Sequence, residues 1–145
     1  EVHDENCWAM GGVSGHAGLF ASAGVVASVG EAYRDAGAVT ASRIVSRHSA
    51  LLARKEWAHS ADERRGLAWA LRTSQRQSCG SRFGARSFGH TGYTGTSLWV
   101  DPDRALTVVL LTNRVYFTRD PGPIFELRGA VHDAIVEDLE QAGSE

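Results

Sequence analysis

Lysine, proline and cysteine are scarce in this sequence. Lys55 is the single lysine among 15 basic residues, and the 145 residues include three prolines and two cysteines. Two cysteines are too few for a disulfide scaffold, and Cys7 and Cys79 lack the CxxC spacing of zinc and redox sites. We therefore expect free structural thiols, although spacing alone leaves their pairing open. A phosphate-binding loop is excluded, because it requires a lysine after its glycines and Lys55 has none nearby.

Long apolar runs and an excess of one charge are also missing. The longest apolar run, 106–111, is broken by Thr107 and is the size of a strand, so no membrane segment is expected. A formal net charge of -2 argues against nucleic acid and anionic lipid as partners. The first residue is Glu1, and no basic region precedes an apolar stretch, so no targeting segment can be read and the localisation stays open. We expect that the chain begins at a cut.

The first part of the chain predicts a loop followed by two helices. Residues 1–21 are rich in glycine and have no period, which is typical of a structured loop. Ser22 can cap a helix that ends near Gly37, and Thr40 or Ser42 can cap a second one that ends between Arg54 and Trp57. The apolar face expected for the first helix is Val25, Val26, Val29, Ala32 and Tyr33. The stripe expected for the second is Ile44, Val45, His48, Leu51 and Leu52, with His48 as a core or boundary residue.

The second part of the chain predicts an antiparallel sheet and a closing helix. After a charged connector at 59–65, strands are expected at 66–72, 87–93, 96–101 and 105–113, and a polar surface loop at 73–86. The last two strands form a hairpin, because Pro102 occupies the favoured second position of a turn over 101–104. The β-branched run in 105–113 favours a central strand. After Pro121, Gly122 and Pro123 comes a helix whose expected apolar face is Ile124, Leu127, Val131, Ala134, Ile135 and Leu139.

These patterns predict one α+β domain, with an antiparallel β-sheet and packed helices. Its parts are a loop and helical region at 1–58, strands at 59–123 and a C-terminal helix at 124–145. No internal repeat and no linker divides the chain.

Two candidate chemistries fail on spacing. Ser14 in the sequence GVSGH lacks the final glycine of a nucleophile elbow. The set His3, Asp4, Glu5 and His16 has no pair spaced to put two ligands on one helix face, so no metal is expected there. These side chains are better explained as caps that pin a glycine-rich loop.

The segment HTGYTGT at 90–96 combines donors and glycines at the end of a predicted strand. The glycines of this segment let a substrate approach the backbone closely, while His90 and Thr91 offer a donor and a hydroxyl at the same end. Taken alone, the segment is equally compatible with a glycine-rich bulged strand that carries a solvated histidine.

Three stretches in order resemble a known family. They are VHDENCWAMGGVSGHAGLFASAG, SFGHTGYTGTSLWVDP and LTVVLLTNRV. The chain is similar to the C-terminal half of the serine hydrolases of the β-lactamase, penicillin-binding protein and esterase superfamily, most of all to class C β-lactamases. This resemblance implies a partial β-lactamase or transpeptidase-like fold. It also places His90, Thr91 and Gly92 in the third motif, KTG or HTG, and makes the N–H of Tyr93 a donor to the oxyanion.

The sequence departs from this family at its other two motifs. No serine is followed three positions later by lysine, and no tyrosine or serine stands two positions before Asn6 or Asn113. The SxxK and YxN motifs are therefore missing from these residues, and with them the nucleophile and the base.

The resemblance implies acyl transfer on a small-molecule ester, amide or lactam, without a cofactor. His90 would be catalytic and Thr91, Gly92 and Tyr93 would bind substrate. The missing N-terminal half of the fold would be a partner, and the chain alone would be inactive. Two alternatives stay open: a non-catalytic peptide- or ligand-binding module derived from the same fold, and a truncated product with no function of its own.

Overall fold

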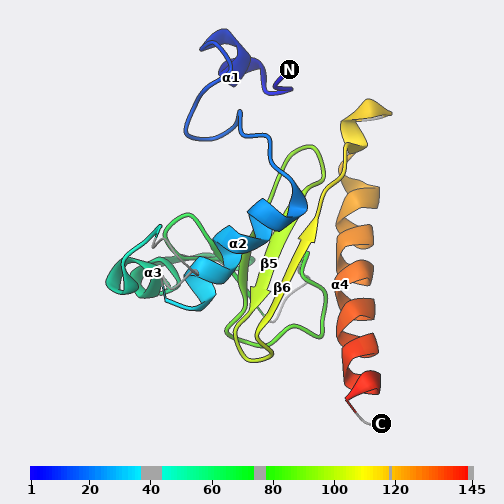
Figure 1. The fold of residues 1–145 in the computed structure, drawn as a ribbon. Helices are drawn as coiled ribbons and strands as arrows, with labels where there is room; N and C mark the ends of the chain where they lie inside the picture. Colours follow the sequence, from blue (N-terminus) through cyan, green and yellow to red (C-terminus); the bar gives the residue numbers. More distant parts are fainter. Residues whose placement is uncertain (37–43, 74–77, 118, 144–145) are drawn as a thin grey trace.

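The computed structural model describes residues 1–36, 44–73, 78–117 and 119–143, and places a sheet between helices (Figure 1). In the described residues the helices are α1 (Glu5–Ala9), α2 (Ala23–Arg34), α3 (Arg47–Ala53), the 3-10 turn η1 (Arg114–Tyr116) and α4 (Gly122–Ala142). The strands are β1 (Ala58–His59), β2 (Arg64–Arg65), β3 (Ala70–Leu71), β4 (Phe88–Thr91), β5 (Ser97–Asp101) and β6 (Leu106–Leu110). The α+β class with an antiparallel sheet is confirmed.

The sheet is a simple antiparallel meander in the order β1 to β6. The predicted hairpin is present, with Trp99 paired to Val108 across β5 and β6. One expectation for the sheet is wrong, because the connector 59–65 contributes to a hairpin of β1 and β2. β6 lies at the edge of the described sheet, so a central position for its β-branched sequence would require a further strand from outside these residues. The strand expected at 66–72 is reduced to Ala70–Leu71.

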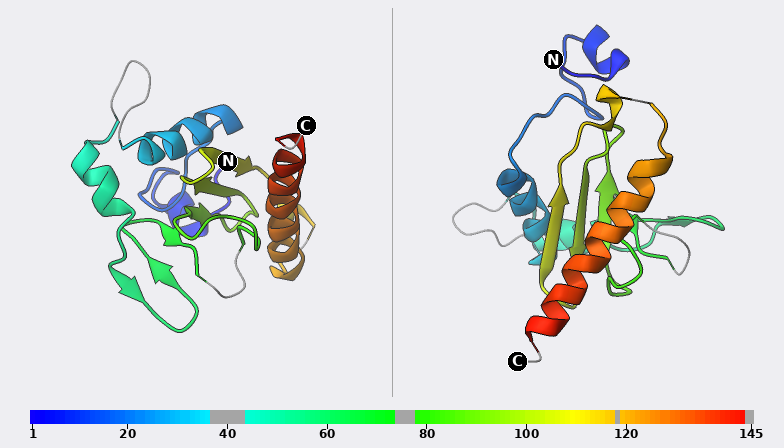
Figure 2. Two further views of the ribbon diagram at one scale, coloured as in Figure 1. Left: turned by 90° about the horizontal axis from the view of Figure 1, so that it is seen from below. Right: turned by 90° about the vertical axis from the view of Figure 1, so that its right-hand side faces the viewer.

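Each face of the sheet carries its own core, because successive side chains of a strand point to opposite faces (Figure 2). On one face α2 and α3 cover an aromatic core around Trp69, Phe88 and Val100. On the other face Val136 of α4 packs with Trp99 in the second core. The two helical layers hold β4 and β5 in place from both sides.

The helix α2 forms where expected, but its apolar face is different. Val25 and Val29 are exposed, whereas Gly30 is buried, and Ala32 and Tyr33 face inward as predicted. A Cβ at Gly30 would lie 2.9 Å from side-chain carbons of both Leu98 and Val100. The close approach of α2 to β5 therefore turns the glycine side of the helix inward.

The second helix, α3, is shorter than expected. Its cap is Ser46, whose side chain accepts a hydrogen bond from the Ser49 N–H, and the proposed caps Thr40 and Ser42 lie outside the described residues. The small residues Ala50 and Ala53 are buried. The predicted stripe is wrong in that Ile44, His48 and Leu51 are exposed.

The closing helix α4 buries one residue in every four. Its buried residues are Ile124, Arg128, His132 and Val136, while the predicted face members Leu127, Ala134 and Leu139 are exposed. Two polar residues thus occupy the inner stripe, which an apolar pattern cannot reveal. No helix in the described parts of the chain has the length and apolar character needed to span a bilayer.

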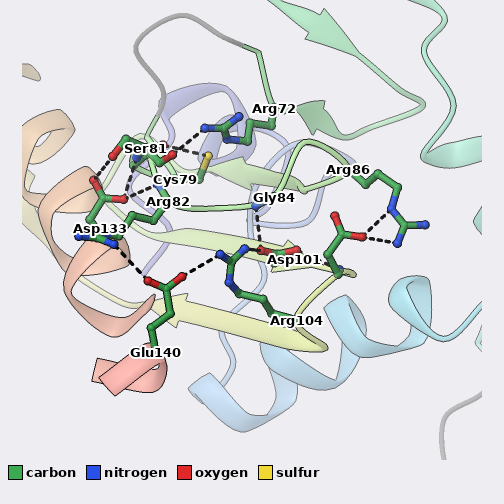
Figure 3. Close-up of polar contacts among 12 residues, drawn as sticks. Arg72, Cys79, Ser81, Arg82, Gly84, Arg86, Asp101, Arg104, Asp133 and Glu140 are labelled. Carbon is green, nitrogen blue, oxygen red and sulfur yellow. Dashed lines mark hydrogen bonds and ion pairs between the residues drawn. The ribbon is translucent and has the colours of Figure 1, made fainter. Parts of the chain in front are cut away.

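The segment expected as a surface loop at 73–86 is partly buried in the described portion that begins at Ser78. Cys79 and Phe83 are almost fully inaccessible, and both cysteines are free thiols. The loop is fastened by carboxylates from two elements (Figure 3). Asp133 of α4 accepts hydrogen bonds from the Ser81 and Arg82 N–H groups, and Asp101 accepts one from the Gly84 N–H. These hydrogen bonds to buried or half-buried carboxylates explain why a polar sequence lies against the core.

The N-terminal segment, expected as a loop, contains the short helix α1 and lies beyond the ends of the strands (Figure 1). Asp4 caps α1 by accepting from the Cys7 N–H at 2.7 Å, and its other contact is His16 Nε2 at 2.9 Å. These bonds lower the pKa of Asp4 below its ordinary value. The predicted capping role of these side chains is confirmed for Asp4 and His16.

Candidate active site

The four candidate residues follow one another where β4 ends and the turn to β5 begins. His90 pairs with Leu98, and Thr91 pairs with Ser97, which closes the strand. The His90 side chain is exposed, Thr91 and Gly92 are half-buried, and Tyr93 is 58% exposed. The structure thus brings His90, Thr91, Gly92 and Tyr93 together at one end of the sheet.

The turn after β4 is tight and depends on two glycines. The Gly92 N–H donates to the Thr96 carbonyl at 2.8 Å, and the Gly95 N–H donates to the Gly92 carbonyl at 3.0 Å. Gly95 has a φ of 102°, in the region that side chains avoid, and a Cβ at Gly92 would overlap the Thr96 hydroxyl. The glycines read from the sequence are therefore required to close this turn.

Tyr93 carries the backbone group of greatest chemical interest. Its N–H donates to no acceptor in the described parts of the chain, whereas its carbonyl accepts from Arg114 Nε at 2.8 Å. The Tyr93 ring lies under the Arg114 guanidinium, with 4.7 Å between the guanidinium carbon and the ring centroid. The His3 ring is a further neighbour, 6.0 Å away between centroids. Tyr93 is thereby held at its carbonyl and its ring, and its amide is left available.

A buried arginine of α4 stands behind this turn. Arg128 is 6% exposed and donates from Nε to the Gly95 carbonyl at 3.0 Å and from Nη2 to the carbonyls of Gly92 and Thr96 at 2.8 and 2.9 Å. Burial lowers the pKa of Arg128 below its ordinary value, and the positive charge of Arg114 adds to that effect. No carboxylate of the described residues forms an ion pair with it, so backbone carbonyls alone offset its charge.

The turn and the start of α4 enclose a surface hollow of about 630 Å³. Its lining includes Thr91, Gly92 and Tyr93 on one side and Arg114 and Arg128 on another, together with residues 121–126. A second hollow of about 260 Å³ lies beside it and is lined by His90, Glu63, Arg65 and Trp99, among others. Thr91 and Arg128 line both hollows, so the end of β4 lies between them.

Charge around His90 comes from the β1–β2 hairpin. Glu63 forms a bidentate pair with Arg65, which lowers the pKa of Glu63, and the nearby His90 contributes weakly in the same direction. This carboxylate lines the same hollow as His90, although the sequence suggested only a charged connector there. Sequence reasoning also missed Arg114 and Arg128. The one signal for Arg128 was its place four residues after Ile124 and four before His132 on the same side of the helix.

Of the residues considered for a metal, Asp4 and His16 are in contact, whereas His3 and Glu5 have other partners. His16 is bonded to Asp4 and to the Ser14 hydroxyl, while His3 lies against Tyr93 and Glu5 pairs with Arg119. In the described ranges, no group of three or more histidine, cysteine, aspartate or glutamate side chains is placed to hold a metal ion.

Comparison with known proteins shows the family of the chain. The family model named Beta-lactamase matches residues 2–132, and the chain therefore belongs to the beta-lactamase family. A protein of Escherichia coli strain K12 named "Putative D-alanyl-D-alanine carboxypeptidase" is 32% identical over 120 residues, which are 79% of this chain and 26% of that protein. A protein of the same name from Salmonella agona is 32% identical over 117 residues. The chain thus spans about a quarter of the length of these relatives.

A solved structure shows the same fold. The crystal structure of a beta-lactamase from Mycobacterium bovis superposes with a TM-score of 0.56 at 25% sequence identity. The match covers 65% of this chain and 38% of the other. The chain is thus a beta-lactamase-family segment that carries the sheet, its packed helices and the HTG sequence at 90–92.

Proposed function

We propose that these residues form one wall of a serine hydrolase site that performs acyl transfer on an ester, amide or lactam. The sequence has one lysine, Lys55, and the residue three positions before it is Leu52, so no serine has the SxxK spacing. The nucleophilic serine and its base therefore come from a region outside this sequence. The residues described here supply hydrogen bonds and shape. A non-catalytic binding module would use the same wall without the nucleophile.

The observation that carries this proposal is the Tyr93 N–H at the rim of a hollow, which has no acceptor among the described residues. When a serine oxygen attacks a carbonyl carbon, negative charge develops on the carbonyl oxygen, and a fixed N–H donor stabilises that charge without reorganising. The turn that holds this N–H is fixed by Gly92, Gly95 and Arg128. Such a rigid donor stabilises the transition state more than the ground state.

The neighbouring side chains take supporting roles. Thr91 lies directly before the turn and offers its hydroxyl to the substrate, and His90 orients substrate or polarises the serine hydroxyl from the exposed end of β4. Collapse of the tetrahedral intermediate expels the leaving group, and water then releases the acyl group from the serine. The names of the relatives bring D-alanyl-D-alanine peptides and β-lactams forward as first substrates to test.

The remaining half of the fold would be the partner of this chain. The edge strand β6 has no neighbour on its outer side in the described sheet, and Leu19 and Phe20 of the N-terminal segment are 97% and 75% exposed. Exposed edges and apolar side chains are features that proteins normally cover. We propose that the region that supplies the nucleophile covers this edge and these side chains.

The test compares the 145-residue chain with the complete protein that contains it. A fluorophosphonate that acylates active serines should label one serine in the complete protein and none in the 145-residue chain, and only the complete protein should hydrolyse a chromogenic lactam or an aryl ester. If a serine of the short chain is labelled and the short chain turns over substrate, the proposal that the nucleophile lies in another region is contradicted. A complete protein that binds a D-alanyl-D-alanine peptide but is never labelled would favour the binding module.

A further inference from the structure

We propose that Arg128 is a positioning residue that sets the direction of the Tyr93 N–H. The inference deepens the proposed function and rests on it, since it concerns the donor offered to the oxyanion. Arg128 acts through the backbone of the turn and touches no reacting atom.

The peptide unit between Gly92 and Tyr93 gives the mechanism. A trans peptide is planar, and its C=O and N–H point in opposite directions, so fixing the oxygen fixes the hydrogen. The described chain contains no cis peptide. The Gly92 carbonyl accepts from Arg128 Nη2 at 2.8 Å and from the Gly95 N–H at 3.0 Å. With two donors on its oxygen, this peptide plane cannot rotate freely, and the Tyr93 N–H stays turned away from Arg128.

Arginine suits this task because its guanidinium is a rigid planar fork. The same Nη2 reaches the Thr96 carbonyl at 2.9 Å, and Nε reaches the Gly95 carbonyl at 3.0 Å. Arg114 holds the next carbonyl, that of Tyr93, at 2.8 Å. Two arginines from separate elements therefore fix the carbonyls on both sides of the Tyr93 residue.

The position of Arg128 argues against a purely packing role. Ile124, His132 and Val136 share its buried stripe, and an apolar side chain there would avoid the cost of burying a charge. The charge instead lies against the oxygen of the very peptide whose N–H is unpaired. A cation at that oxygen also polarises the peptide and strengthens the N–H as a donor.

The test replaces Arg128 and follows the Tyr93 amide directly. Gly92–Tyr93 is the only Gly-Tyr pair in this sequence, so labelling with 13C at glycine carbonyls and 15N at tyrosine marks this amide. The variants are Arg128→Lys, which keeps the charge but loses the fork, and Arg128→Met, which keeps the unbranched stem. Arg86→Lys is the matched control, because Arg86 binds Asp103 at the surface beyond the other end of β5. All variants are made in the complete protein.

We expect the Tyr93 amide resonance to move in both Arg128 variants, with no change in Arg86→Lys. The second-order rate constant of serine acylation should fall by about 10²-fold, the effect of misplacing a reacting geometry by about 1 Å. KM should change far less than kcat, and the acyl-enzyme carbonyl stretch should rise in frequency as its hydrogen bond weakens.

Two results separate failure of this inference from failure of the proposed function. An unchanged Tyr93 amide with a lowered melting temperature would overturn the positioning role, whatever happens to the rate. A shifted amide in a protein whose wild-type form is never acylated would support the positioning and overturn the hydrolase proposal. A folded Arg128→Met variant with wild-type acylation would also overturn the inference.

Discussion

His90 is the exposed side chain of a strand whose preceding residues, Phe88 and Gly89, are buried. It contributes little to the core, so its removal should affect chemistry more than folding. In the complete protein, His90→Ala should lower kcat/KM by ~10²- to 10³-fold, the usual cost of removing one preorganised donor from a site. The melting temperature should stay close to that of the wild type.

The matched control is His48→Ala, because His48 is also exposed but lies on α3, away from the hollows. That variant should keep both rate and stability. Wild-type turnover in His90→Ala would remove His90 from the site, and a large loss of melting temperature would assign it a structural role.

At the scale of residues, the sequence could group those candidates that are neighbours along the chain. His90 to Tyr93 are consecutive, and Gly92 and Gly95 show the need for a tight turn without any tertiary information. Arg128 could not be found in this way, since its partners are carbonyls of residues more than 30 positions earlier. A backbone carbonyl leaves no mark in the sequence, so an arginine that binds only carbonyls has no recognisable partner.

The secondary-structure elements were easier to predict than their faces. The start of α4 follows from Pro121 and Gly122, and the β5–β6 hairpin follows from the turn at Pro102. The buried stripe of α4 was misjudged because Arg128 and His132 replace apolar residues along it. The buried face of α2 was also misjudged, because it contains Gly30, and a glycine carries no hydrophobic signal.

His132 in α4 should make stability depend on pH. Its Nδ1–H donates to the Arg128 carbonyl, its Nε2 has no hydrogen-bond partner in the described residues, and its ring packs edge-on against Phe83. Burial lowers the pKa of His132 below the unfolded value near 6.5, and contributions from the Arg128 carbonyl and from Asp133 oppose this only in part. The neutral form therefore predominates in the native state.

The direction of the pH effect follows from proton binding. Between the lowered native pKa and about 6.5, the unfolded state binds more protons than the native state, so the free energy of unfolding falls as pH decreases through this window. Above about pH 6.5 the contribution of His132 is fully present. The variant His132→Leu should flatten this part of the stability curve, as measured by denaturant unfolding between pH 7.5 and 5. The control His48→Ala should leave the slope unchanged, and an equal slope in His132→Leu would contradict the assignment.

The β5–β6 hairpin depends on the buried carboxylate of Asp101. It accepts from the N–H groups of Gly84 and Asp103 at 2.8 and 3.0 Å and from Arg104 Nη1 at 3.0 Å (Figure 3). Asp101→Ala leaves these donors unpaired, so the free energy of unfolding should fall by roughly 1–3 kcal/mol. Asp101→Asn keeps an acceptor oxygen and should lose less. Thermal unfolding measures both, and replacing the exposed Arg86 by lysine should have a much smaller effect.

At the scale of the whole molecule, the described sheet is covered on both faces but not along β6. In the described sheet no strand pairs with its outer edge, and an unpaired edge is a template for pairing with another strand. Apolar side chains of the N-terminal segment are also exposed, with Leu19 and Phe20 the clearest examples. If the remainder of the fold covers these surfaces, the 145-residue chain alone should self-associate, and the complete protein should not.

Sedimentation over a range of concentrations measures this directly. The 145-residue chain should show mass that rises with concentration, and adding the separately produced remainder of the protein should replace these species with one 1:1 complex. A Leu19→Ser, Phe20→Ser double variant should associate less without a lower melting temperature, because both side chains are largely exposed and contribute little to the core. A short chain that stays monomeric and melts sharply in calorimetry would instead show that β6 and the N-terminal segment need no cover. That result would leave these residues as a self-sufficient domain and would remove the argument from exposed surface for a partner region.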